Sequence, residues 1–335
     1  MSKLKASAIA PSNIAFSKYW GKIDDELTLP LNDSISMTLD TIFTHTTVEF
    51  GPQYAKNEVW LSDSKTKATL AKDQKQARVL QQLKRLRRLA GVKDFAKVVS
   101  HNNFPTGAGI ASSASGFSAL TAACLAALNI QVDKKQQSIL TRLAGSGSAT
   151  RSVYGGFVKW HQGKNSESSY AEQLYDQDHW DLANIILVTE SAAKKHSSLI
   201  GHARSKSSPF MVARLKAVLQ HNQDLETALK SKDFQLLGQV IEQEMFSLHA
   251  VTMTSQPPIL YWNGTTVEIL HEVRKLRDQG LESYATLDAG PNVHLITESS
   301  NIKKLQKHFS DFVGVKQIFV CKVGKGVKIT KQHLF

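Results

Sequence analysis

The chain has 335 residues, of which 41% are hydrophobic and 21% charged, and its net charge is +12. This balance excludes a disordered or fibrous protein and leaves room for two domains that each bury a core. The basic excess favours an anionic partner, and nucleic acid, acidic lipid and phosphorylated metabolites all meet that description.

The two cysteines, Cys124 and Cys321, are far apart and show neither a disulfide framework nor the spacing of a zinc site. The N-terminal residues lack a continuous apolar core and a cleavage site, so we expect no signal peptide. Both observations favour a cytoplasmic protein.

The first distinctive segment is "SNIAFSKYWGK", which places Lys18, Tyr19, Trp20 and Lys22 together. Two aromatic rings with two ammonium groups are suited to closing around a small anion. An edge strand with a buried tryptophan and solvated lysines would give the same pattern, so the segment alone does not decide between the two.

A strand and a helix are expected next. Residues 35–50 alternate apolar and polar side chains and are rich in Thr, Ile and Val, which predicts a strand with a hairpin. Residues 72–90 place Val79 and Leu83 on one stripe, with Lys and Arg opposite. They predict an amphipathic helix that ends at Gly91.

A strand over 95–100 leads into the loop "PTGAGIASSASG" (105–116), and an Ala/Leu-rich helix follows. Small residues let a backbone approach a ligand, the free N–H groups at a helix start attract phosphate, and hydroxyls suit a magnesium ion. A tightly packed, serine-rich helix start would have the same composition. The loop matches neither the P-loop nor the G-x-G-x-x-G pattern, so any nucleotide is held differently here.

No residue between Asn102 and Val132 is charged, a pattern shared with membrane-spanning helices. Six hydroxyl side chains in this stretch would be costly to expose to lipid. We therefore predict a helix that is buried within the protein.

Asp133 is the expected N-cap of the next helix, which ends at a second loop of small residues, "GSGSATRSVYGG" (145–156). This loop combines Ser146 and Ser148 with Arg151. An arginine can grip a carboxylate or a phosphate with two parallel hydrogen bonds. A glycine-rich turn with a surface arginine is the alternative.

Beyond residue 180, which we take as the domain boundary, the pattern predicts a small α+β sandwich. The expected strands are 182–189, 283–288, 293–297 and 316–323, and the expected helices are 209–221, 233–250, 264–279 and one near 301–313.

Asp288 ends one of these strands, in "LDAGPNVHLI". A carboxylate in this place is suited to be a general base or a metal ligand, although Asp before Gly is also a common turn former. The twelve histidines show no metal-binding spacing, and the sequence has no G-x-S-x-G nucleophile motif.

Five segments together resemble a known family: "SNIAFSKYWGK", "LPLNDSISMTL", "NNFPTGAGIASSASGFSAL", "GSGSATRSVYGGFVKW" and "LDAGPNVHLI". They closely resemble the motifs of diphosphomevalonate decarboxylases, in the same order and with similar separations, over nearly the whole chain. This family belongs to the GHMP kinase superfamily of small-molecule kinases. The resemblance implies an α+β fold with an N-terminal ribosomal-protein-S5-like domain (1–180) and a C-terminal ferredoxin-like domain (181–335). It also implies an active site between them and a homodimer.

The resemblance further implies a reaction in which MgATP and (R)-5-diphosphomevalonate give ADP, phosphate, carbon dioxide and isopentenyl diphosphate. Asp288 would orient or deprotonate the 3-hydroxyl of the substrate, and Arg151 would hold its carboxylate. Lys22 belongs both to the catalytic set and to the substrate contacts, with Tyr19, Trp20, Gly21, Arg87, Ser146, Ser148 and Ser198. The residues implied around the ATP phosphates are Pro105, Gly107, Ala108, Gly109, Ala111, Ser112 and Ser113, with Ser112 as a candidate Mg²⁺ ligand.

One position departs from the family pattern. Bacterial members usually carry an arginine where "KKHSSLIG" has Leu199, which offers no donor for the second phosphate. A decarboxylase of 5-phosphomevalonate and a mevalonate 3-kinase therefore stay open, although Asp288 and Lys22 together favour decarboxylation. A basic nucleic-acid-binding protein is the alternative from another class. It is disfavoured because the basic residues are scattered without interleaved aromatics.

Overall fold

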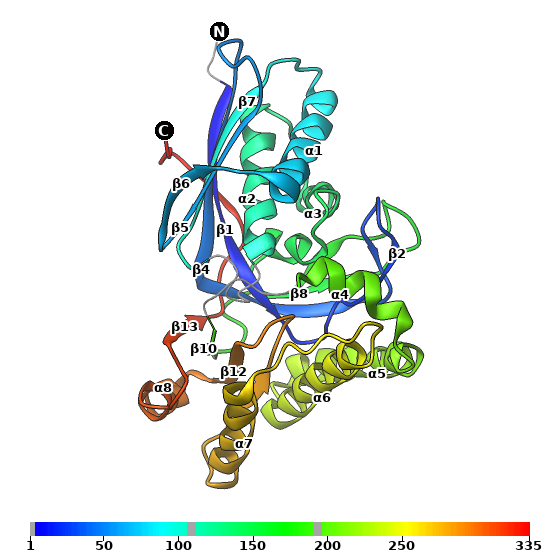
Figure 1. Ribbon diagram of the computed structural model, residues 1–335, viewed down its shortest axis with the longest axis vertical. Helices are drawn as coiled ribbons and strands as arrows, with labels where there is room; N and C mark the ends of the chain where they lie inside the picture. The colour runs from blue at the N-terminus through cyan, green and yellow to red at the C-terminus, as the bar shows by residue number, and fades with distance from the viewer. Residues whose placement is uncertain (1–3, 106–111, 191–195) are drawn as a thin grey trace.

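The computed structural model describes residues 4–105, 112–190 and 196–335, and two sheets organise them (Figure 1). The first sheet has eight strands in the order β14-β1-β4-β7-β5-β6, while β8 pairs with β4 and β9. Its strands are β1 (Leu4–Ala15), β4 (Ser34–Phe50), β5 (Glu58–Asp63), β6 (Thr66–Leu70), β7 (Ala96–Asn102), β8 (Phe157–Trp160), β9 (Ala171–Tyr175) and β14 (Lys328–Thr330). A small separate hairpin consists of β2 (Lys22–Asp24) and β3 (Leu29–Pro30).

The hairpin predicted within residues 35–50 is wrong, because β4 is one continuous strand of 17 residues. It pairs with β1 in both of its halves, with β8 over its first residues and with β7 over its last. Asp40 and Thr41 are its exposed residues, between the stretches that pair with β8 and with β7. No Gly, Pro or Asn lies in this stretch to favour a tight turn, so the alternating pattern continues as strand.

Three α-helices belong to the first half of the chain: α1 (Asp73–Ala90), α2 (Ser112–Ala127) and α3 (Lys134–Arg142). The amphipathic helix predicted over 72–90 is confirmed, and Gly91 ends it with a left-handed φ of 68°. The Asp133 side chain accepts the Gln136 N–H and caps α3, as predicted. The uncharged helix α2 packs against β1 and β4, mostly buried. Among the described helices, none has the length and apolar character to cross a membrane.

The second sheet has four antiparallel strands in the order β11-β12-β10-β13. They are β11 (Tyr284–Thr286), β12 (Val293–Glu298), β10 (Leu182–Val188) and β13 (Gln317–Lys322), so the four strands predicted for this half are confirmed. The helices of this half are α4 (Ser198–Arg204), α5 (Met211–Ser231), α6 (Phe234–Met253), α7 (Gly264–Asp278) and α8 (Ile302–Ser310). Three short 3₁₀ segments are η1 (Gly147–Val153), η2 (Ser205–Ser207) and η3 (Ser299–Asn301).

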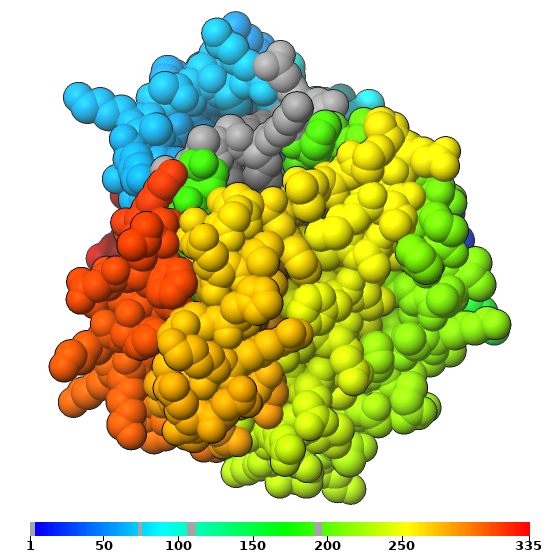
Figure 2. Space-filling view, turned by 60° about the horizontal axis from the view of Figure 1, so that its bottom comes forward, coloured from blue at the N-terminus to red at the C-terminus, as the bar shows by residue number. Residues whose placement is uncertain are grey.

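A hydrophobic cluster spans the two halves, in addition to a cluster within each. Ile35 and Met37 of β4 and Phe157 of β8 belong to the same buried cluster as Leu237 and Ile241 of α6. In the space-filling view, the C-terminal half, coloured yellow-green to red, packs against the blue N-terminal half (Figure 2). Because burial of this apolar surface joins the halves, residues on either side of the junction hold fixed relative positions.

Candidate active site between the two halves

A cavity of about 120 Å³ lies at the junction of the halves. The segment after β1 lines it on one side, and η1 and the residues before it line a second side. α4 and the turn after β11 contribute from the C-terminal half. Among its lining residues are Lys18, Tyr19, Trp20, Lys22, Arg78, Ser113, Ser146, Ser148, Arg151, Ser198, Leu199, His202 and Asp288. The structure therefore brings most of the expected substrate contacts to one place.

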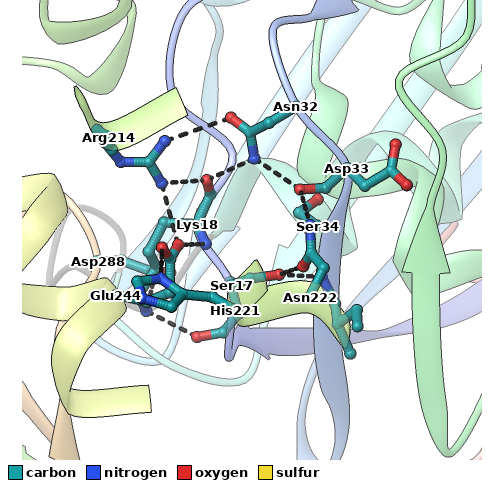
Figure 3. Close-up of polar contacts among 12 residues, drawn as sticks. Ser17, Lys18, Asn32, Asp33, Ser34, Arg214, His221, Asn222, Glu244 and Asp288 are labelled. Carbon is teal, nitrogen blue, oxygen red and sulfur yellow. Dashed lines mark hydrogen bonds and ion pairs between the residues drawn. The ribbon is translucent and has the colours of Figure 1, made fainter. Parts of the chain in front are cut away.

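At the cavity, Lys18 forms an ion pair with Asp288 (Figure 3). The Lys18 Nζ donates to Asp288 Oδ1 at 2.9 Å and to the Ala15 carbonyl at 2.7 Å. The lysine side chain is only 2% exposed, whereas the Asp288 side chain is 26% exposed. Burial lowers the pKa of Lys18, and the attraction of Asp288 opposes this.

The Asp288 carboxylate is ionised at neutral pH. Its recessed position by itself would raise the pKa, but the Lys18 ammonium, with help from Arg151, outweighs this and holds the pKa of Asp288 below its usual range. The sequence singled out Lys18 only as part of an aromatic cluster. Its pairing with Asp288, 270 positions away, left no local signal.

Arg151 is buried behind the same cavity. Its Nη1 donates to Ser34 Oγ at 2.6 Å and its Nη2 to Asn13 Oδ1 at 3.3 Å, while its Nε has no partner among the residues described. Burial lowers the pKa of Arg151 to about 10, against the attraction of Asp288, so it stays charged at neutral pH. An orphaned N–H on a buried cation at a cavity is suited to an anionic ligand.

The residues at the end of the first loop of small residues and those of the second lie side by side at the cavity. Ser146 Oγ donates to Ser113 Oγ at 3.3 Å and lies 3.4 Å from Ser148 Oγ. The start of α2 and the residues before η1 therefore present three hydroxyls to one cavity.

A cluster of three rings forms another wall. The His202 ring packs against both Tyr19 and Trp20 in tilted contacts, with centroid distances of 4.2 and 4.5 Å. Its Nδ1 accepts the Gly21 N–H at 2.9 Å, which leaves the proton on Nε2. Burial, with repulsion from Lys22, lowers the pKa of His202 to about 3, so the ring is neutral. Sequence reasoning missed His202, which belongs to no motif.

The arginine of α1 that lines the cavity is not the one expected. Arg87 lines neither cavity described here: its Nη1 donates to the Asp94 carbonyl at 2.9 Å, near the end of the helix. Arg78 instead lines the cavity, and its guanidinium lies 4.4 Å from the centroid of the Phe117 ring. Nine residues of helix separate the two by roughly 13 Å along the axis, so they cannot replace each other. In so arginine-rich a helix, sequence alone does not identify the arginine that faces inward.

A larger cavity of about 980 Å³ adjoins the first, and Arg78 and Ser113 line both. Strands β5–β7 and helices α1 and α2 surround it, with Lys72, Ser112 and Phe117 among its lining residues. Cations, hydroxyls and the start of α2 fit a nucleotide with its phosphates toward the smaller cavity. Pro105 is described but does not line this cavity, and the other expected phosphate contacts Gly107, Ala108, Gly109 and Ala111 fall outside the described residues.

Two family models match this chain. The model of the diphosphomevalonate decarboxylase-like N-terminal domain matches residues 10–171, and that of the mevalonate 5-diphosphate decarboxylase C-terminal domain matches residues 184–328. The chain belongs to the diphosphomevalonate decarboxylase family. The resemblance noted in the sequence is thereby confirmed.

Full-length relatives agree with this membership. The diphosphomevalonate decarboxylase of Candida albicans is 34% identical over 98% of this chain and 99% of that protein. The mevalonate diphosphate decarboxylase from Staphylococcus aureus has a TM-score of 0.91 and 36% identity, covering 98% of both chains. A structure described as MDDEF in complex with MVAPP, AMPPCP and magnesium has a TM-score of 0.91 and 36% identity, covering 99% of this chain and 100% of that one. The expected α+β fold in two parts is confirmed.

Both halves of this member of the family contribute residues to the cavity. Lys18, Arg151 and Ser113 belong to the first, and Asp288 and His202 to the second. Lys22 lies at the rim, where its Nζ pairs with Asp25 at 2.9 Å, and Leu199 lines the cavity beside Ser198.

Proposed function

We propose that this chain catalyses the ATP-dependent decarboxylation of (R)-5-diphosphomevalonate to isopentenyl diphosphate, with release of ADP, phosphate and carbon dioxide. One observation carries the proposal: an ionised carboxylate, Asp288, paired with Lys18 and close to Arg151, in a cavity that opens toward a nucleotide-sized one. Family membership and the ligands named for the related structure, MVAPP, AMPPCP and magnesium, support it.

In the proposed mechanism, Asp288 positions the 3-hydroxyl of the substrate. A carboxylate is too weak a base to ionise a tertiary alcohol outright, so Asp288 orients the hydroxyl and takes its proton late, as the new oxygen–phosphorus bond forms. The Lys18 ammonium keeps Asp288 ionised for this step. ATP with Mg²⁺ supplies the phosphoryl group that makes the oxygen a leaving group.

Arg151 is proposed to hold the substrate carboxylate through its free Nε–H and its neighbours. The carbon–carbon bond that joins this carboxylate to the rest of the substrate then breaks. Its electron pair forms the alkene as the C3–O bond breaks and phosphate leaves. Burial of Arg151 strengthens its attraction for the carboxylate, because little water competes. The cavity thus couples the departure of neutral carbon dioxide and of phosphate to the formation of one double bond.

Other substrate contacts are proposed from the residues that line the cavity: Tyr19, Trp20, Lys22, Ser146, Ser148 and Ser198, with Arg78 in the place expected of Arg87. Gly21 does not line the cavity; its N–H binds His202, and it stays a proposed contact by resemblance alone. Pro105 to Ser113 are proposed to surround the ATP phosphates, with Ser112 as the candidate Mg²⁺ ligand. We also propose that the protein is a cytoplasmic homodimer and that its two domains divide near residue 180. The domain division is supported by the family models, because the first ends at residue 171 and the second begins at residue 184.

A second candidate is a decarboxylase of 5-phosphomevalonate. Leu199 favours it, because this side chain lines the cavity and donates no hydrogen bond. Four cations that line the same cavity favour the diphosphate instead: Lys18, Lys22, Arg78 and Arg151.

The test is a coupled assay of ADP and carbon dioxide with mevalonate, 5-phosphomevalonate and 5-diphosphomevalonate in parallel. Equal ADP and carbon dioxide from the diphosphate alone are expected, and Asp288→Asn should abolish both while the protein stays folded, as a cooperative thermal transition would show. ADP without carbon dioxide, or preference for the monophosphate, would contradict the proposal. If no substrate turns over and the protein instead binds nucleic acid with steep salt dependence, the nucleic-acid alternative is correct.

A further inference from the structure

Lys18 lies beyond the last residue of β1, so its backbone N–H and C=O form no hydrogen bonds with a neighbouring strand. Side chains form hydrogen bonds with both groups instead (Figure 3). The Lys18 N–H donates to Glu244 Oε2 at 2.8 Å, and the Lys18 carbonyl accepts from Arg214 Nη2 at 2.7 Å and from Asn32 Nδ2 at 3.1 Å. Both polar groups of this residue are therefore held, mainly from the other half of the chain.

We propose that Glu244 and Arg214 form a buried clamp that fixes the Lys18 backbone, and through it sets the Lys18 ammonium against Asp288. This inference rests on the function proposed above, and makes both residues positioning residues for the reaction. Neither lines the two cavities described, so neither is assigned a contact with substrate.

The clamp is an ion pair between two helices of the C-terminal half. Arg214 of α5 and Glu244 of α6 are 3.1 Å apart, with side chains 1% and 0% exposed. The second Glu244 oxygen pairs with His221 Nδ1 at 2.8 Å, so both carboxylate oxygens are occupied. Asn222 of α5 accepts the Ser17 hydroxyl, which fixes the preceding residue as well.

Stability alone does not account for such a pair. Desolvation of two charges cancels much of their attraction, and apolar side chains of similar volume would join α5 and α6 at least as well. What an apolar pair would lack is an acceptor for the Lys18 N–H and a donor for its carbonyl. The distinctive contribution of the clamp is therefore the placement of Lys18.

Loss of the clamp should act on catalysis in a specific way. If the Lys18 backbone shifts, its ammonium moves away from Asp288, and the pKa of Asp288 rises because the neighbouring positive charge held it down. The other groups that face this pair are Arg151, His249 and His294. Burial lowers the pKa of His249 to about 3 and that of His294 to about 4, so neither imidazole carries a charge at neutral pH.

The experiment compares Glu244→Gln and Arg214→Lys with a matched control, Glu242→Gln. Glu242 also lies on α6 and pairs with Arg277 through two contacts of 3.1 and 3.2 Å, away from Lys18. For both clamp variants, kcat should fall about 10- to 100-fold, as expected for a small displacement of a reacting group. The KM values for ATP and diphosphomevalonate should change less than twofold, and the acid limb of the kcat profile should move to higher pH. Glu242→Gln should keep the wild-type kcat and profile.

Combination with Lys18→Met tests the route of the effect. In that background, the clamp substitutions should lower kcat no further, because the group that they position is gone. Additive losses would overturn the inference, as would folded clamp variants with wild-type kcat or an unshifted acid limb. If Glu244→Gln does not fold, Arg214→Lys, which keeps the buried charge, carries the same test.

A readout without turnover separates this inference from the proposed function. Failure of the wild-type protein to convert diphosphomevalonate would overturn the function. The clamp would then be judged by the titration of the Asp288 carboxyl carbon, followed by NMR. Its midpoint should rise in Glu244→Gln and stay in place in Glu242→Gln, and an equal midpoint in both would overturn the clamp.

Discussion

Gly147 leaves no room for even one methyl group, which makes Gly147→Ala a sharp test of the cavity wall. A Cβ at this position would lie 2.3 Å from Trp160 Cη2 and 2.8 Å from Tyr19 Cε1. Neither ring can move freely, because Trp160 is fully buried with its Nε1 bound to Ser169 Oγ, and Tyr19 packs edge-on against it. Overpacking against such neighbours typically costs about 1–3 kcal/mol.

Two rigid rings place Gly147→Ala near the upper end of that range, so we expect a loss of about 2–3 kcal/mol. For a chain of 335 residues, the melting temperature should fall by roughly 3–4 °C. Because the Tyr19 ring lines the cavity and must shift, KM for the substrate should rise as well. Thermal and urea unfolding with steady-state kinetics measure these effects.

Gly264→Ala is the control, since a Cβ there meets nothing within 4 Å. It opens α7, where alanine is favoured over glycine, so stability should be unchanged or slightly higher. Wild-type stability and KM for Gly147→Ala would refute the packing argument.

Four further substitutions test the charges at the cavity, with Arg87→Ala as the control outside it. Leu199→Arg adds a charge-assisted hydrogen-bond donor worth about 1.5–3 kcal/mol. KM for the diphosphate should therefore fall about tenfold or more, and KM for the monophosphate far less. An unchanged ratio of the two KM values would contradict a contact with the second phosphate. Arg78→Ala should raise KM for ATP or substrate, whereas Arg87→Ala should leave both unchanged, as steady-state kinetics would reveal. Lys18→Met should raise the pKa of Asp288 and move the acid limb of kcat to higher pH; a limb that stays in place would mean that Lys18 does not control this carboxylate.

Local features were predictable because their causes are local. The stripe of α1, the Asp133 cap of α3 and the fully buried run of β10 all follow from residues within a few positions of one another. The two loops of small residues could be identified for the same reason, and Ser113 and Ser146 do meet.

Contacts between distant residues were not predictable. Lys18 has the same neighbours in the sequence whether or not Asp288 lies beside it, and Glu244 is 226 positions away. The residues of β4 allow a continuous strand, but its distant partners β8 and β7, which pair with its first and last residues, could not be read from them. His202 became recognisable only in the structure, where its ring packs against those of Tyr19 and Trp20.

The last strand, β14, has a consequence for how the protein is made. It pairs with β1 through Ser7, Ala8 and Ile9, so β1 leaves the ribosome long before its partner on that side. Until β14 has been translated, that side of β1 is an open edge that can pair with other chains. A fragment that stops near residue 180 would keep this edge open permanently and should aggregate more readily than the full chain. The N-terminal sheet thus reaches its final form only after the C-terminal half has been translated.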